Sequence, residues 1–166
     1  MIQVGDRIPD ATLTESTEFG EACPVSPSKV SVAEATQKKR VVIFGLPGAY
    51  TPTCSAKHVP GYVQKLADLK AKKIDEVWCV SVNDGYVMAA WGREQKAIGK
   101  VRMLGDGNGD FAKKLGLETD LSGGGMGLRM KRFSMLVDDG VVKQLNIEAP
   151  GKFEVSNAET MLAQLA

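Results

Sequence analysis

Two short apolar runs, each followed by a helical pattern, constrain the fold of this chain more than any other feature. The runs are VVIFGL at residues 41–46 and EVWCVSV at residues 76–82, both rich in β-branched residues. Such short, nearly continuous apolar runs are typical of strands buried on both faces of a sheet. Apolar residues then recur at helical spacing between Val59 and Leu69, where Pro60 predicts a kink or a later start of the helix. They recur again between Val87 and Trp91, after Asn83-Asp84-Gly85, which offers a cap. The order strand, helix, strand, helix predicts an α/β fold.

The C-terminal third predicts a hairpin and a closing helix. Residues 133–138 and 141–147 are strand-like and flank Asp139-Gly140, a strong two-residue turn signal. From residue 156 onward the apolar residues follow a helical stripe, for which Ser156 or Asn157 can serve as the N-cap. An antiparallel hairpin added to strand–helix alternation indicates a mixed central sheet flanked by helices, and a thioredoxin-like arrangement satisfies that order.

The middle of the chain completes the expected order of elements. Residues 101–104 predict a third strand, and a short helix follows around residues 111–115, opened by Asp110 or Asn108. Prolines and serines mark residues 21–31 as a loop. No repeat or low-complexity tract divides the chain, so residues 1–166 are expected to form one thioredoxin-like domain.

Composition excludes several classes of protein. The chain has 43% apolar and 25% charged residues, and its formal net charge is +1. These values are ordinary for a globular protein and provide no overall field to attract nucleic acid or an anionic membrane. The first residues lack a basic segment followed by an apolar run, so a cytoplasmic location is expected. Three irregularly spaced cysteines argue against a disulfide framework and suit a reducing compartment.

Cys54 is the main candidate for chemistry. It follows the first buried strand and falls where a helix begins, so backbone amides and the helix dipole favour a negative charge on its sulfur. A helix start with cationic neighbours can lower a cysteine pKa enough for the thiolate to dominate at neutral pH. The alternative is a buried structural thiol, because free cysteines are among the most buried residues. Position alone supports both interpretations equally.

Two neighbours of Cys54 have similarly divided interpretations. Thr51 lies three residues before the sulfur, with Pro52 fixing the turn between them, so its hydroxyl could hold a peroxide oxygen beside the thiolate. Without the rest of the motif, a role as a turn or cap threonine is favoured. Pro47 either ends the strand or shields the sulfur from water.

Four segments together resemble the peroxiredoxins. PGAYTPTC at residues 47–54 has proline, threonine and cysteine at the spacing of the family's active-site signature. SAKHVPGY at residues 55–62, SVND at 81–84 and KRFSM at 131–135 are similar to the type II, or atypical two-cysteine, subfamily, the peroxiredoxin-5-like group. The resemblance covers nearly the whole chain. It implies a thioredoxin-like fold, reduction of hydrogen peroxide and alkyl hydroperoxides without metal or flavin, and a homodimer with its contact near the active-site loops.

The resemblance also implies roles for four residues. It identifies Cys54 as the thiolate that attacks a peroxide oxygen and becomes a sulfenic acid, with Thr51, Pro47 and Arg132 completing the site. The Arg132 guanidinium would stabilise both the thiolate and the developing oxyanion. Without the resemblance, the basic residues around it would be taken for a solvated stretch. If this segment is extended, Lys131 and Arg132 face opposite sides and only one of them lines the site.

Regeneration of the thiol is less constrained. Some relatives have a resolving cysteine near the C-terminus, where this chain has FEVS at residues 153–156. Cys79 matches the second cysteine of the plant type II group, but a structural role in its buried strand is as well supported. An external thiol is the simpler reductant, either glutaredoxin with glutathione or thioredoxin. Cys23 lies in the early loop and is taken as incidental.

Other interpretations are less well supported. His58 lies one helical turn after Cys54 and could suggest a metal site, but with one histidine and scattered cysteines a packing or hydrogen-bonding role is favoured. The glycine-rich segment at residues 123–127 lacks the Lys-Ser or Lys-Thr of a phosphate loop. A thiol-disulfide oxidoreductase would need a second cysteine near Cys54. A non-enzymatic binding module would have no need for the combined proline, threonine, cysteine and arginine.

Overall fold

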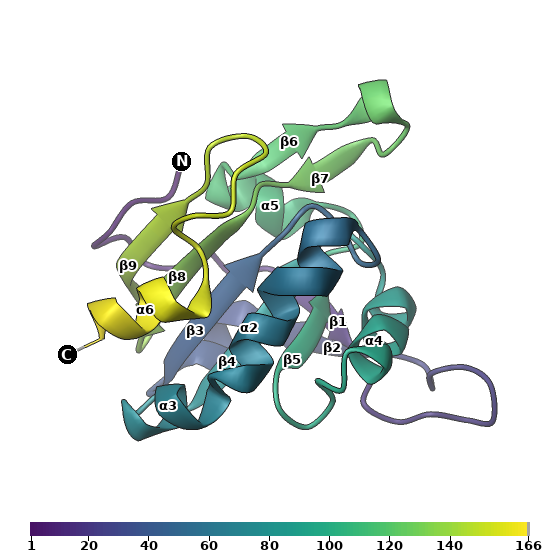
Figure 1. Cartoon of the computed structure of the whole chain (residues 1–166), viewed down its shortest axis with the longest axis horizontal. Coiled ribbons are helices and arrows are strands. Elements are labelled where there is room, and N and C mark those ends of the chain that lie inside the picture. The colour runs from purple at the N-terminus through teal and green to yellow at the C-terminus, as the bar shows by residue number, and fades with distance from the viewer. Residues whose placement is uncertain (166) are drawn as a thin grey trace.

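A seven-stranded mixed sheet forms the centre of the molecule (Figure 1), in a computed structural model that describes residues 1–165. Its strand order is β2-β1-β5-β4-β3-β8-β9. The three inner strands β5, β4 and β3 are parallel to one another, and every other pairing is antiparallel. The strands are β1 (Thr12–Glu15), β2 (Ser28–Ser31), β3 (Arg40–Gly45), β4 (Glu76–Ser81), β5 (Arg102–Gly105), β8 (Phe133–Asp138) and β9 (Val141–Ile147).

Helices cover both faces of the sheet. One face carries the π-helix η1 (Cys54–His58) with α2 (Val59–Gln64), α3 (Leu66–Ala71), α4 (Gly85–Glu94) and α6 (Ala158–Gln164). The other carries α1 (Val32–Thr36) and α5 (Asp110–Leu115). The mixed sheet between helices confirms the predicted α/β class.

The alternation of side chains along the central strands creates two cores. In β3, Val41 and Ile43 belong to the cluster beneath α1 and α5, whereas Val42 and Phe44 belong to the cluster beneath the other helices. Successive side chains of a strand point to opposite faces. The side chains on both faces of β3 are fully buried. This explains why the sequence of the strand is continuously apolar. Cys54 lies in the second cluster, so its sulfur is part of a packed core.

The hairpin turn and the N-caps of helices α4 and α6 are as predicted. Asp139 and Gly140 have φ values of 47° and 81°, the left-handed conformations that a two-residue hairpin turn requires. Asp84 accepts from the amide of Val87 at the start of α4, and Asn157 caps α6.

Two local predictions are wrong. Residues 28–31, expected within a loop, form strand β2, which pairs with β1 at the edge of the sheet. The short helix α5 begins at Asp110, but neither Asp110 nor Asn108 caps it. Instead, the buried carboxylate of Asp106 accepts from the amides of Phe111 and Ala112 at 3.1 and 2.9 Å. Neither feature has a strong local sequence pattern. Strand β2 is only four residues long, and Asp106 lies before the turn that leads into α5.

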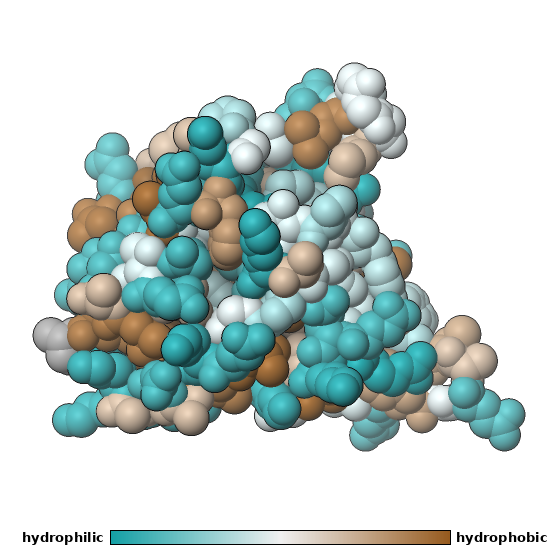
Figure 2. Space-filling model, viewed as in Figure 1, coloured by the Kyte–Doolittle hydropathy of each residue, from teal (hydrophilic) through white to brown (hydrophobic). Residues whose placement is uncertain are grey.

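A second, two-stranded sheet projects above the main one in Figure 1. It consists of β6 (Glu118–Asp120) and β7 (Leu128–Met130), and the glycine-rich segment forms the short 3-10 helix η2 (Ser122–Gly124) at its tip. Polar side chains cover most of the face seen in Figure 2, with apolar groups in small separate areas. Within residues 1–165 no helix has the length and apolar character needed to cross a bilayer.

Candidate active site

The site begins where β3 ends at Gly45. The loop that follows is fixed by its own hydrogen bonds and by the end of β4. The Thr51 hydroxyl donates to the Gly48 carbonyl at 2.7 Å, and the Ala49 amide donates to Asn83 Oδ1 at 3.0 Å. Asn83 was expected only as part of a helix cap, and its role in holding this loop was not predicted. The loop therefore has one defined path into the helix.

Cys54 occupies the first turn of that helix, as predicted. The helical conformation starts at residue 52, and the turn then widens, since the amide of Val59 donates to the Cys54 carbonyl five residues earlier. This wider turn comes directly before Pro60, which lacks an amide hydrogen. It is the irregularity in the helix that the proline predicted. The Cys54 side chain has no exposed surface.

Arg132 contacts the sulfur directly. Its Nη2 donates to Cys54 Sγ at 3.2 Å, and its Nη1 donates to His58 Nδ1 at 3.0 Å. A permanently charged donor therefore lies within hydrogen-bond distance of the sulfur. The predicted cysteine and arginine are thus brought together, although they are 78 residues apart in the sequence.

The hydrogen bonds of His58 define its tautomer. A guanidinium can only donate, so Nδ1 must accept from Arg132 and the proton lies on Nε2, which donates to the Ser156 carbonyl at 3.0 Å. Burial, together with the neighbouring positive charge of Arg132, lowers the pKa of His58 to about 3. The side chain is therefore neutral at physiological pH, in the hydrogen-bonding role that the sequence favoured.

The segment of residues 148–156 covers the arginine–histidine pair. The Phe153 ring lies 5.0 Å from the His58 ring and 5.8 Å from the Arg132 guanidinium carbon. Residues 153–156, where the resemblance led us to look for a resolving cysteine, have the sequence FEVS and contain none. In this chain an aromatic ring packs against the arginine instead.

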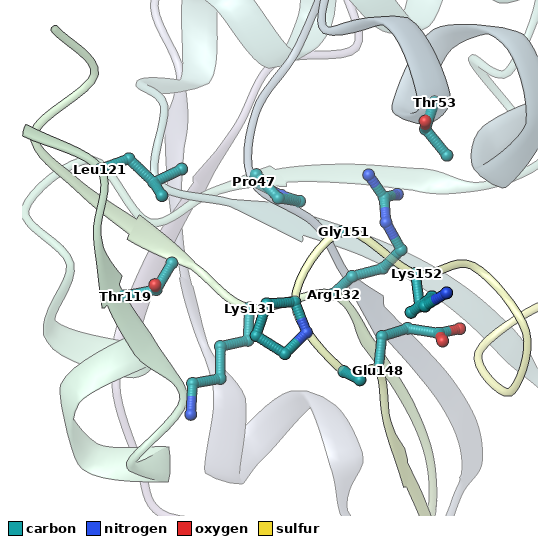
Figure 3. A pocket seen from close by; sticks show the side chains of 11 residues that line it. Pro47, Thr53, Thr119, Leu121, Lys131, Arg132, Glu148, Gly151 and Lys152 are labelled. Carbon is teal, nitrogen blue, oxygen red and sulfur yellow. The ribbon is translucent and has the colours of Figure 1, made fainter. Parts of the chain in front are cut away.

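A cavity of about 290 Å³ opens beside Arg132 (Figure 3). Its walls combine apolar groups with hydroxyls and two lysines, and they include Pro47, Thr53, Leu121, Lys131, Arg132 and Lys152. Lys131 and Arg132 extend in opposite directions in Figure 3, yet both line the cavity. The expectation that only one would do so depended on an extended segment, whereas these two residues lie between β7 and β8 and belong to neither strand.

Pro47 and Thr51 occupy different parts of the site. Pro47 lines the cavity, and its carbonyl accepts from Arg129 Nη1 at 3.2 Å. Thr51 does not line this cavity and uses its hydroxyl hydrogen within the loop, which leaves the hydroxyl oxygen able to accept. Arg129 was considered only as part of a basic stretch. Nothing in the sequence showed that it would hold the proline.

The other two cysteines differ in environment. Cys79 is fully buried in β4 opposite Phe44, and burial, with a further contribution from Cys54, raises the pKa of its thiol. Cys23 is exposed in the early loop. All three cysteines are free thiols.

Comparisons with known proteins agree with this geometry. The profile of the Redoxin family matches residues 3–162. Peroxiredoxin-2E, chloroplastic, from Arabidopsis thaliana is 46% identical over 166 residues, which cover 99% of this chain and 69% of that protein. Peroxiredoxin-2B from the same plant is 43% identical, with 99% and 98% covered. The structure of reduced Prx3 from Vibrio vulnificus in complex with H2O2 superposes with a TM-score of 0.91 at 47% identity, and both chains are covered completely.

Proposed function

Since the chain belongs to the redoxin family, as a type II peroxiredoxin with the thioredoxin-like fold, and is a thiol-dependent peroxidase, we propose that Cys54 supplies the reacting thiol. The observation that carries this proposal is the 3.2 Å contact from Arg132 Nη2 to Cys54 Sγ. Within residues 1–165, Arg132 donates no hydrogen bond to Cys79, which is buried, or to Cys23, which is exposed. Of the three cysteines, Cys54 is therefore the one with a cation hydrogen-bonded to its sulfur.

The reaction at this sulfur is a displacement on oxygen. The thiolate of Cys54 forms a bond to one peroxide oxygen, the O–O bond breaks, and the second oxygen leaves as an alkoxide or hydroxide that takes up a proton. The products are a sulfenic acid and an alcohol or water. Arg132 stabilises the negative charge as it moves from sulfur to the leaving oxygen, and Thr51 Oγ1 can accept the hydrogen of the hydroperoxide.

The cavity beside Arg132 supports alkyl hydroperoxides as substrates in addition to hydrogen peroxide. It has room for an organic group, and Pro47, Leu121 and Pro150 contribute apolar walls. The Vibrio vulnificus relative was crystallised with H2O2, which supports the smaller substrate here. The carbon chain of a larger hydroperoxide would lie in this cavity, with its peroxide group toward Arg132.

Glutaredoxin with glutathione, or thioredoxin, is proposed as the reductant. Among residues 148–156, the segment that packs against Arg132, there is no cysteine. Cys79 is fully buried, so a disulfide to Cys54 would require the core to rearrange. An external thiol attacking the sulfenic acid needs no second cysteine in this chain.

The proposal also includes a cytoplasmic homodimer. Tyr50 in the active-site loop and Tyr86 in α4 are 51% and 47% exposed, and large exposed aromatic residues are enriched at protein interfaces. Sedimentation of the reduced protein tests the dimer, and a monomer would contradict it. Fractionation of expressing cells tests the location, since the curated relatives include chloroplastic and mitochondrial proteins.

The test of the reacting thiol is a stoichiometric reaction. Reduced protein is mixed with one equivalent of hydrogen peroxide, and loss of peroxide and of thiol are measured together. Cys54→Ser should abolish the reaction, whereas the matched control Cys23→Ser should match the parent. Peroxide loss that persists in Cys54→Ser would contradict the assignment, and insulin reduction without peroxide loss would favour a thiol-disulfide oxidoreductase.

A further inference from the structure

Glu148, just beyond the end of β9, is a buried carboxylate with an unusually complete set of partners. It is 7% exposed and accepts from the amides of Glu154, Val155 and Ser156 at 2.7–2.9 Å, and from the Ser156 hydroxyl at 2.7 Å. Burial raises the pKa of Glu148, but these hydrogen bonds outweigh it and hold the pKa below its ordinary value. Within residues 1–165 its charge is balanced by backbone amides, since no salt bridge to it is found.

These hydrogen bonds fix the position of the Ser156 carbonyl, which itself accepts two hydrogen bonds. It accepts from Tyr62 at 2.9 Å and from His58 Nε2 at 3.0 Å. His58 then accepts from Arg132 on its other nitrogen, and Arg132 donates to Cys54 Sγ. A continuous series of hydrogen bonds therefore runs from the carboxylate to the sulfur.

We propose that Glu148 is a positioning residue for the peroxidase reaction, acting through Ser156 and His58 to hold the Arg132 guanidinium against the Cys54 sulfur. This inference rests on the proposed role of Cys54. The carboxylate holds the Ser156 carbonyl in place, the carbonyl fixes the ring plane and tautomer of His58, and the ring fixes one arm of the guanidinium. With one arm of the guanidinium held in this way, its other arm points at the Cys54 sulfur.

The charge of the side chain is essential to this role. A carboxylate presents only acceptors, which suits a position surrounded by four donors. All four donors reach Oε2, and Glu154 N also reaches Oε1. An amide would therefore place its NH2 group against the Glu154 N–H and offer the other donors a neutral oxygen in place of a charged one. Glu148→Gln should therefore displace residues 154–156 while changing the size of the side chain very little.

Asp106 provides a matched control. It is also a buried carboxylate, 2% exposed, and it also accepts from two backbone amides at the start of a helix. Its helix α5 packs in the core on the opposite face of the sheet from Cys54. Asp106→Asn should therefore disturb two buried backbone hydrogen bonds without any path of hydrogen bonds to the sulfur.

Three measurements on Glu148→Gln and Asp106→Asn separate positioning from stability. Urea unfolding measures stability, stopped-flow mixing with hydrogen peroxide measures the first step, and the pH dependence of Cys54 alkylation reports its thiolate. Both variants should unfold at lower urea. Only Glu148→Gln should react about tenfold more slowly, less than the loss of a whole oxyanion donor, and should need a higher pH for alkylation.

A fourth measurement uses the single histidine of the chain. Its imidazole nitrogen NMR signals report the tautomer and the hydrogen bond from Arg132, and they should change in Glu148→Gln but not in Asp106→Asn. Should Glu148→Gln fail to fold, Glu148→Asp carries the same test, since it keeps the charge but withdraws it by one methylene. Its changes should have the same direction and be smaller.

The outcomes distinguish this inference from the proposed function. An unchanged peroxide rate and alkylation profile in a folded Glu148 variant, or equal changes in Asp106→Asn, would overturn the positioning role while the parent remained an active peroxidase. Peroxide reduction by the parent that does not depend on Cys54 would overturn the proposed function itself.

Discussion

At the scale of single residues, the site depends on one planar cation with two separate hydrogen-bond partners. Arg132 donates to a sulfur through one nitrogen and to an imidazole through another. This arrangement uses the rigid fork of a guanidinium and not only its charge. Charge and geometry can therefore be tested separately by substitution.

Arg132→Lys should slow the reaction of Cys54 with hydrogen peroxide about a hundredfold, because a single ammonium on a flexible stem cannot hold both partners. Stopped-flow kinetics on the reduced protein measure this step. Lys131→Met is the matched control, since it removes a neighbouring positive charge from the same cavity without touching the sulfur. An unchanged rate in Arg132→Lys would remove the fork from the mechanism.

Acid should destabilise the fold through His58. Its pKa is lowered from the ordinary 6.5 to about 3, so between these values the unfolded chain binds a proton that the folded chain does not. The free energy of unfolding should therefore fall as the pH drops below about 6.5, by up to about 1.4 kcal/mol per pH unit. Urea unfolding at several pH values measures the slope, and His58→Asn should flatten it. An equal slope in that variant would assign the effect to other groups.

The residues of the site were predictable to different degrees. Cys54 and Arg132 stand in sequence segments that resemble a family signature, and the structure brings them into contact. Glu148 acts through the backbone of the segment that follows it, whereas Asn83 and Arg129 act through backbone groups of distant loops. No local pattern marks such contacts, because they depend on which loops the fold places side by side.

At the scale of secondary-structure elements, β3 and β8 must approach closely enough to place Arg132. Gly45 is opposite Phe133 in this antiparallel pair. A Cβ on Gly45 would collide with the Phe133 ring and would lie 2.7 Å from Met130 Sδ. The strand that ends at the active-site loop therefore requires glycine at its last position.

Gly45→Ala should destabilise the protein by about 1–3 kcal/mol, because the extra methyl group overpacks a fully buried region. Chemical unfolding measures the change. Gly123→Ala is the control, since a Cβ there meets nothing within 4 Å. A loss as large at Gly123 as at Gly45 would contradict the steric explanation.

The predictability of the elements followed the strength of their patterns. The central strands and the hairpin about Asp139 carry continuous apolar runs or a turn with a defined backbone conformation. The short strands β2, β6 and β7 have three or four residues and little burial. Their pairing is decided by the rest of the fold, so their own sequences do not predict it.

At the scale of the whole molecule, the sheet separates two cores that have different tasks. The apolar cluster with α1 and α5 includes no cysteine and supports the sheet, whereas the other includes Cys54 and Cys79 and lies beside the aromatic residues around His58. The thioredoxin-like architecture was predictable from the order of the elements. The placement of both buried cysteines in one core was not predictable, because it depends on how the helix that contains Cys54 packs onto β4.

Cys79→Ser should retain most peroxide turnover supported by glutaredoxin and glutathione, because an external thiol needs no second cysteine in the chain. A coupled assay with glutaredoxin, and a parallel one with thioredoxin, measures turnover. Loss of turnover in Cys79→Ser, together with a Cys54–Cys79 disulfide detected in the parent by mass spectrometry, would assign the resolving role to Cys79.

Because Cys54 is completely buried, access to its sulfur depends on the size of the reactant, and the peroxide and the reductant differ in size. Because the sulfur has no exposed surface, a small peroxide needs a slight movement of the neighbouring side chains to touch it, whereas a reductant of protein size needs the chain around it to open. Oxidation and reduction of the same atom therefore call for two shapes of the first helical turn, and the turnover cycle must include an opening and a closing of the chain between them.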